Sequence, residues 1–252
     1  MSEERSLKLS SMHSGYAADP VAWKNFLECW YRTSGERHKE ILQADPEEPF
    51  ISILEKYSGK ISGSAGVRDT SKTVEALEES LGVALPKSYK DFLSAYQPPE
   101  LLPRSVGSWK FTVGMYAPRQ VGRLGRLASD HVSEMEKWPI DSSDSEYFRY
   151  GMGQASTSGR TRYARDAIVV GKYSDESYAF VVLYPQVVTA DGEMEASLLM
   201  HSGEFRAPSF AELMRQLSFL ETRAVDSMPP YPQSTLHGTC ADKLLMDRVW
   251  WD

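Results

Sequence analysis

Two glutamates at period two, Glu193 and Glu195, form the pair whose spacing best suits acid–base chemistry. On a strand, alternate residues lie on one face, so the two carboxylates could act together on a bound group. The residue between them, Met194, is apolar, and this alternation predicts acids that point to solvent and a methionine that points to the core. The pattern therefore favours exposed acids over a catalytic pair.

Two other segments contain residue types found in cofactor or metal sites, but each lacks further features that such a site needs. Gly151 to Ser156, GMGQAS, begins like a dinucleotide-binding loop, but its sixth position is serine and no convincing βαβ unit follows. Asp130, His131 and Glu134 come closest to a metal set. His131 and Glu134 could share a helical face, and such a pair is usually a surface interaction. We predict neither a cofactor nor a metal.

Nucleophilic catalysis and nucleic-acid binding have equally little support. Cys29 lies in an apolar helical pattern, where burial would suppress the reactive thiolate, and no GxSxG motif occurs. Cys240 is far away in sequence, which predicts two free buried thiols rather than a disulfide framework. Arg119, Arg123 and Arg126 form a basic stripe, but no aromatic residues interleave to stack bases. We therefore expect neither an enzyme nor a nucleic-acid-binding protein.

Length and charge are those of an ordinary globular protein. With 252 residues, 41% of them hydrophobic, the chain can bury a self-sufficient core. Its formal charge of −7 disfavours a general hold on nucleic acid and suits a basic partner, although modest net charge also serves solubility. The N-terminus is charged and no apolar run approaches membrane-spanning length. We expect a cytoplasmic protein that does not engage a membrane.

The first element that the sequence predicts is a docked helix after Asp19-Pro20, because proline favours the first helical turn. Its apolar residues recur at helical spacing and would form one broad face: Trp23, Phe26, Leu27, Trp30 and Tyr31. A proline-punctuated and then Gly/Ser-rich connector follows. We assign residues 1–69 to an N-terminal helical extension and connector.

Two more helices are expected before Pro98. Thr70 or Ser71 could cap the first, and Gly82 should end it, since glycine takes the left-handed conformation without a side-chain clash. Pro86 fits the start of the second helix. The following middle segment contains a strand-like WKFTVGMY and a helix that should end before Pro139. Residues 147–150 suggest a short strand, and residues 151–160 a flexible loop.

The segment 178–223 predicts strand, loop, strand and helix. Two apolar runs, 178–184 and 196–200, flank the turn dipeptide Asp191-Gly192. Ser209 and Glu212 fit a capping box at the start of the helix. The helix would turn four apolar residues toward the strands: Phe210, Leu213, Met214 and Leu217. Residues 224–252 read as a proline-containing linker followed by an amphipathic segment that docks on the domain.

Two parts of this pattern resemble the SUKH superfamily, a module found widely among bacterial toxin-neutralising proteins. The stretch EALEESLGVALPKSYKDFLSAY, residues 75–96, is similar to the two-helix opening of that domain. Residues 179–214 are similar to its C-terminal half, in the expected order. The resemblance implies an α+β fold over residues 70–223, with helices packed on one face of a mainly antiparallel sheet. The segment from Trp23 to Tyr31 would match the additional N-terminal helical segment of a bacterial subgroup.

The resemblance also implies function by binding. An immunity protein of this kind would neutralise a cognate bacterial toxin, often a nuclease or other nucleic-acid-modifying enzyme, by stoichiometric contact without catalysis. A toxin with a basic active-site surface would attract acidic contacts. Our candidates for such contacts are Asp175, Glu176, Asp191, Glu193 and Glu195. The alternative is a cytoplasmic scaffold or regulatory adaptor of the SUKH type.

Overall fold

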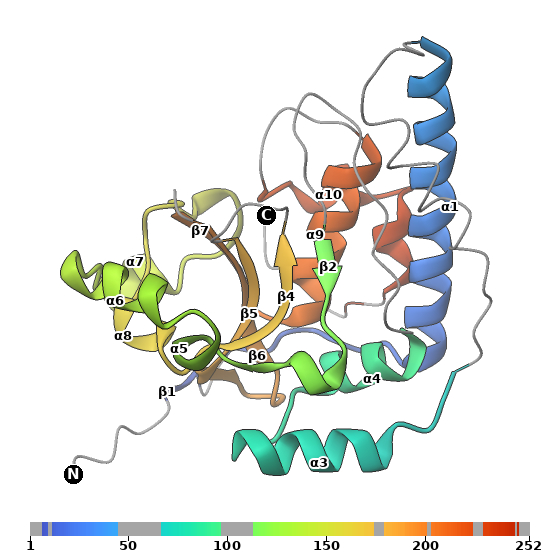
Figure 1. The fold of residues 1–252 in the computed structure, drawn as a ribbon. Coiled ribbons are helices and arrows are strands. Elements are labelled where there is room, and N and C mark those ends of the chain that lie inside the picture. The colour runs from blue at the N-terminus through green and yellow to red at the C-terminus, as the bar shows by residue number, and fades with distance from the viewer. Residues whose placement is uncertain are drawn as a thin grey trace.

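A mainly antiparallel sheet lies at the centre of the computed structural model (Figure 1). The structure describes residues 7–9, 12–44, 67–96, 113–173, 179–200, 203–223, 229–244 and 246. Their seven strands are β1 (Leu7–Leu9), β2 (Val113–Met115), β3 (Gly122–Arg123), β4 (Ile168–Tyr173), β5 (Phe180–Thr189), β6 (Met194–Met200) and β7 (Gly203–Ala207). Strands β4 to β7 are antiparallel neighbours, β2 and β3 pair antiparallel with β4, and β1 is parallel to β5.

Helices cover this sheet, and an N-terminal helix extends the fold. The longer ones are α1 (Pro20–Ala44), α3 (Ser71–Leu81), α4 (Lys87–Ala95), α6 (Ser129–Lys137) and α9 (Phe210–Arg223). The short ones are α5 (Leu124–Leu127), α7 (Asp144–Tyr147), α8 (Thr161–Ala164), α10 (Gln233–Leu236), η1 (Pro118–Gln120), η2 (Gly151–Gly153) and η3 (Cys240–Lys243). The expected α+β class, with its mainly antiparallel sheet and N-terminal helical extension, is confirmed.

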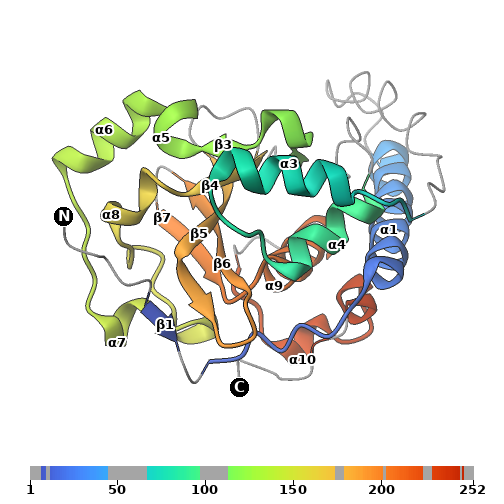
Figure 2. The same cartoon turned by 90° about the horizontal axis from the view of Figure 1, so that it is seen from below.

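Both faces of the sheet are buried. Along β5, Val181 and Leu183 enter one hydrophobic cluster, whereas Val182 and Tyr184 enter a second one on the opposite face. The first cluster lies beneath α1, α4 and α9, and the second lies beneath helices α5 to α8. Figure 2 shows the sheet between these two groups of helices. The sequence predicted helices on one face, and helices α5 to α8 add a layer on the other.

Helix α1 is part of the main core. It begins at Pro20 as predicted, and the Asp19 carboxylate accepts a hydrogen bond from the Ala22 amide at 2.8 Å. Trp23 is fully buried, with ring centroids 5.3 Å from Phe92 of α4 and 5.6 Å from Phe210 of α9. The segment boundaries at residues 69/70 and 223/224 stay predictions, but α1, α4 and α9 share one core.

The predicted helix ends are largely confirmed. Gly82 ends α3 in the left-handed conformation, with φ of 66°. Thr70 stands at the N-cap of α3, yet its hydroxyl contacts Ser94 at 3.0 Å instead of capping the helix. At the start of α9, the Ser209 hydroxyl accepts from the Glu212 amide at 3.2 Å, which confirms the Ser209 half of the capping box.

Residues 147–150 do not form the short strand that the sequence suggested. Tyr147 ends the helical turn α7, and Ser143 and Glu146 form a capping box at its start. The Glu146 carboxylate accepts from both the amide and the hydroxyl of Ser143, at 3.2 and 2.9 Å. These local bonds favour a helical turn over an extended segment.

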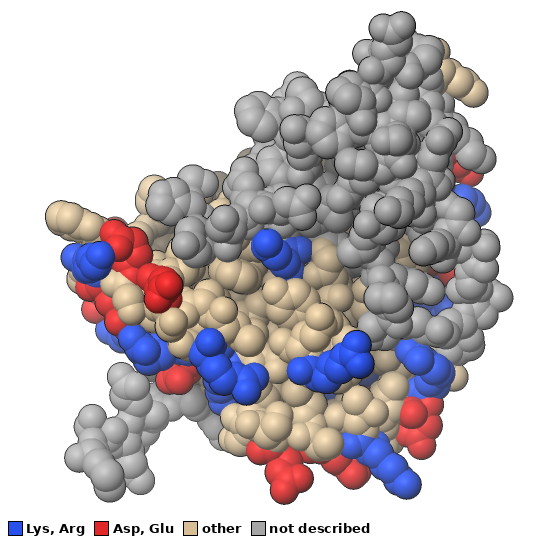
Figure 3. Space-filling view, in the orientation of Figure 1, with Lys and Arg blue, Asp and Glu red and all other residues tan. Residues whose placement is uncertain are grey.

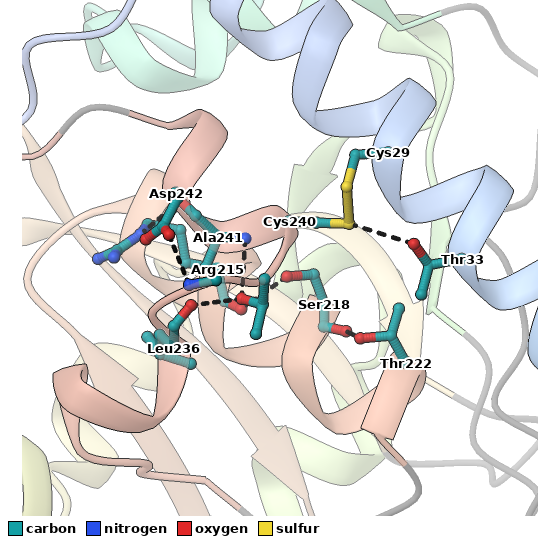
Figure 4. Close-up of a disulfide and its surroundings, with 11 residues drawn as sticks. Cys29, Thr33, Arg215, Ser218, Thr222, Leu236, Cys240, Ala241 and Asp242 are labelled. Carbon is teal, nitrogen blue, oxygen red and sulfur yellow. Dashed lines mark hydrogen bonds between the residues drawn. A yellow bond between two sulfur atoms is a disulfide. The ribbon is translucent and has the colours of Figure 1, made fainter.

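A disulfide between Cys29 of α1 and Cys240 of η3 corrects the expectation of two free thiols (Figure 4). The two residues are 211 positions apart, but the core brings α1 and η3 together, and their Cα atoms lie 5.5 Å apart. Thr33 Oγ1 lies 3.6 Å from Cys240 Sγ. Distance along the sequence was therefore a poor guide to distance in space.

Replacing both cysteines with alanine should lower the free energy of unfolding by about 2–5 kcal/mol, because the bond constrains a long loop in the unfolded chain. Guanidinium denaturation of the double variant would measure the loss. Wild-type protein unfolded with a reductant is the control and should match the double variant. Two titratable thiols in unreduced, denatured wild type would contradict the bond.

Replacing Ser209 with alanine should lower the free energy of unfolding by about 1 kcal/mol, because the Glu212 amide loses its acceptor at the start of α9. Thermal denaturation would measure the change. Ser234→Ala, at an exposed position of α10, is the matched control and should stay within about 0.5 kcal/mol of wild type. Equal melting midpoints for all three proteins would count against the cap.

Candidate functional site

Glu193, which the alternation predicted to be exposed, is 1% exposed. Its Oε1 accepts from the Ser88 amide at 2.8 Å, and its Oε2 accepts from the Ser88 hydroxyl. Ser88 lies in the first turn of α4, whose N-cap residue Pro86 has no side-chain acceptor. The carboxylate therefore supplies the missing acceptor at the positive end of a helix. The expectation of a surface acid was wrong here.

Glu195 was also expected at the surface and is 0% exposed. The prediction assumed that one face of the strand meets solvent, as in many antiparallel sheets. Strand β6 instead lies between β5 and β7, and α7 and η2 cover the face that carries Glu195. Tyr147 and Tyr150 donate their hydroxyl protons to its two carboxylate oxygens.

Glu195 belongs to a buried group that we call the Arg206 cluster. Its members are Glu195, Ser197, Glu204, Arg206, Tyr147, Tyr150 and Tyr184. Arg206 is 0% exposed and lies 3.7 Å from Glu195 and 3.6 Å from Glu204. Its guanidinium carbon lies 4.1 Å from the centroid of the Tyr147 ring, and its Nη1 donates to the Tyr147 carbonyl. One cation thus serves two buried carboxylates.

The Arg206 cluster also fixes the loop that the composition marked as flexible. Gln154 donates to the Arg206 carbonyl at 2.8 Å and accepts from the Arg206 amide at 2.6 Å. Glu204 accepts from Tyr184 and Ser197 at 3.0 and 2.9 Å. The two Gln154 bonds connect the GMGQAS loop to β7, so its glycines lie in a structural loop packed against the sheet.

Burial sets the electrostatics of these acids. It raises the pKa of Glu193 and of Glu195 from 4.5 to about 7, and it raises the pKa of Glu204. Arg206 opposes the rise for Glu195 and Glu204, and the Ser88 hydrogen bonds oppose it for Glu193. A carboxyl group of this kind could exchange a proton near neutral pH, but its oxygens are occupied by other side chains.

The other three candidate acids do not form a shared surface with Glu193 and Glu195, which are both buried. Asp191 is exposed, but its carboxylate accepts from the Ser14 amide at 2.9 Å and from the Ser14 hydroxyl at 2.6 Å. Burial acts to raise the pKa of Asp191, and the hydrogen bonds from Ser14 hold it below its usual value. Asp175 and Glu176 lie outside the described residues.

The other motifs are dispersed or serve the fold. Within the described ranges, no group of three or more His, Cys, Asp or Glu residues could hold a metal ion. His131 is buried, with its ring centroid 6.1 Å from that of Phe180. In the basic stripe, Arg123 donates to the Leu81 and Asp166 carbonyls at 2.7 and 2.6 Å, which ties α3 to the start of β4. No helix in the described part is long and apolar enough to cross a membrane.

Few features of the sequence indicate the Arg206 cluster. In GEFRA, Glu204 and Arg206 alternate with apolar residues, a pattern that usually marks the solvent side of an edge strand. Tyr147 and Tyr150 come from a distant segment, so only the tertiary fold brings them to Glu195. No protein-family model matches the chain, and neither a curated protein nor a solved structure matches it.

Glu195→Gln should make stability less dependent on pH. Because the pKa of Glu195 is higher in the folded protein than in the unfolded chain, its stabilising contribution is complete below about pH 4.5 and disappears as the pH rises through about 7. The variant should lose about 2–3 kcal/mol less unfolding free energy than wild type between pH 5 and pH 8. Urea denaturation at both pH values would measure this difference.

The exposed Glu75→Gln on α3 is the control and should follow the pH dependence of wild type. Parallel stability curves for wild type and Glu195→Gln would show that the carboxyl group does not titrate in this range.

Proposed function

We propose that this protein is an immunity protein of the SUKH type, which binds a cognate bacterial toxin and neutralises it by stoichiometric contact without catalysis. The observation that carries the proposal is the contact between Glu193 and Ser88. Ser88 lies in the segment that resembles the two-helix opening of the family, and Glu193 lies in the segment that resembles its C-terminal half. A buried, charge-assisted hydrogen bond joins the two segments.

The packing of these segments supports the proposal further. The first forms most of α3 and all of α4, and the second forms β5, β6, β7 and the start of α9. Phe92 of α4 and Phe210 of α9 lie with ring centroids 5.2 Å apart in the main core. Two stretches that are separated by more than eighty residues in the sequence therefore act as one structural unit.

The two buried acids serve the fold, because other side chains occupy their oxygens. Glu193 holds the start of α4, and Glu195 holds two tyrosines beneath the sheet. The net charge of −7 suits a toxin whose active site binds phosphate and is therefore basic. A nuclease or another nucleic-acid-modifying enzyme is the target class that we propose.

We place the complex in the cytoplasm, where a toxin of this class meets its substrate. Disulfides are rarely maintained in that compartment, so the Cys29–Cys240 bond sets a condition on the proposal. The reduced protein must also fold and bind the toxin. Binding should therefore be compared with and without a reductant.

Co-expression with the toxin domain encoded beside this gene should rescue growth, and the two proteins should purify as a complex of fixed stoichiometry. Growth curves and size-exclusion chromatography with light scattering would measure the two effects. A toxin made inactive by substitution of its catalytic residue is the control for growth and should still bind. Failure of rescue together with the absence of a complex would remove the proposal, and an adaptor role would then become the better hypothesis.

A further inference from the structure

Trp138 is the most exposed large hydrophobic side chain among the described residues, at 78%. Tryptophan is highly buried on average, and this one follows directly after α6, with Pro139 next. Two residues further on, Ile140 is 46% exposed. Neither side chain belongs to the two hydrophobic clusters that hold the fold together. Two apolar side chains are therefore exposed to solvent and take no part in the core.

The backbone that carries them is held firmly. The Ile140 amide donates to Thr161 Oγ1 at 2.9 Å, and the Thr161 amide donates to the Ile140 carbonyl at 2.8 Å. The Ser142 amide donates to the Gly159 carbonyl at 3.0 Å, and the Gly159 amide donates to Ser142 Oγ at 3.2 Å. A side chain on a fixed backbone loses less conformational entropy when a partner binds it.

Carboxylates surround the two apolar residues. Glu134, Glu136, Asp141, Asp144 and Glu146 lie in the segment 134–146 and are all exposed. Three exposed cations pair with them, namely Lys137, Arg162 and Arg165, and so does the buried Arg160. The carboxylates outnumber these four cations. Figure 3 shows Asp and Glu side chains gathered beside Lys and Arg over the α6 end of the molecule.

We propose that the toxin binds to this surface, formed by residues 134–146 and called the Trp138 surface, an inference that rests on the proposed function. The indole of Trp138 would enter an apolar pocket of the toxin, and Ile140 would pack at its edge. The surrounding carboxylates would meet a basic rim, which fits an enzyme that holds phosphate. Binding sites commonly combine such an aromatic anchor with a polar rim.

The carboxylates of the Trp138 surface outnumber the cations that pair with them by one. A second copy of this chain would bring the same net negative charge, whereas a basic toxin surface would neutralise it. Three of the ion pairs, Lys137–Glu134, Arg162–Asp141 and Arg165–Glu136, have exposed partners and contribute little to stability, so their carboxylates can exchange partners when a basic rim approaches. The surface thus fits a basic protein better than it fits itself.

Trp138→Ala should weaken binding of the inactive toxin domain by about 30-fold or more and leave the melting midpoint unchanged, because the indole contacts the partner and not the core. Isothermal titration calorimetry and thermal denaturation would measure the two quantities. Val21→Ala is the matched control, since Val21 is 55% exposed on α1, and it should bind as tightly as wild type.

Glu134→Lys should slow association and weaken its dependence on salt, with little change in dissociation, because it reverses an exposed charge in the rim. Glu75→Lys on α3 makes the same change in net charge away from the Trp138 surface and should have the smaller effect. Biolayer interferometry at two salt concentrations would compare them.

Three outcomes would overturn the assignment. If wild type binds the toxin and Trp138→Ala binds it equally well, the toxin contacts another surface, while the immunity function stands. If Trp138→Ala instead abolishes a dimer of wild type in sedimentation velocity, the Trp138 surface joins two copies of this chain. If wild type binds no toxin, the proposed function fails, and this inference fails with it.

Discussion

Strand β6 is buried on both faces, and this burial dictates where the polar side chains around it must lie. A central strand covered on both sides has no solvent-facing row, so any polar residue on it needs a partner inside the protein. Glu195 and Ser197 find such partners on the face beneath α7, where Arg206 supplies the cation and three tyrosines supply hydroxyl groups. The same constraint explains why α7 and η2 hold their places, since Tyr147 and Gln154 form part of that network.

The opposite face depends on apolar packing, and it joins both ends of the described chain. Trp23 of α1 contacts Phe92 and Phe210, while Leu236 and Leu244 from the C-terminal residues enter the same cluster. The disulfide adds a covalent link between these ends. Polar contacts hold the C-terminal residues as well, because Arg215 donates to the Ala241 carbonyl at 3.1 Å (Figure 4) and Gln216 accepts from the Tyr231 amide at 2.8 Å. An N-terminal extension that contributes this much to the core is part of the fold and not an appendage.

Local signals in the sequence predicted local structure well. Pro20, Gly82 and Ser209 each mark a helix end through a property of the residue itself, and each stands where that property requires. The turn at Asp191-Gly192 follows the same rule, with Gly192 at φ of 82°. The site residues were harder, because the period-two spacing predicted that Glu193 and Glu195 share one face of a strand. Glu193 instead precedes β6 and contacts α4, whereas Glu195 contacts α7 on the opposite face of the sheet. Cys29 and Cys240 carried no local signal at all, since only the packed core brings them together.

The buried acids and the residues of the Trp138 surface are different sets of residues, because a buried acid needs its partners inside the protein. An acid that holds a helix start or an arginine in the core cannot also meet a partner, because its oxygens are occupied and its surroundings are closed to water. A residue free to bind must be one that the fold does not need, and exposed apolar side chains on a fixed backbone meet that condition. Trp138 lies outside both hydrophobic clusters, so selection for stability gives no reason to keep an indole there. The core of this protein and its proposed contact surface are therefore made of different residues.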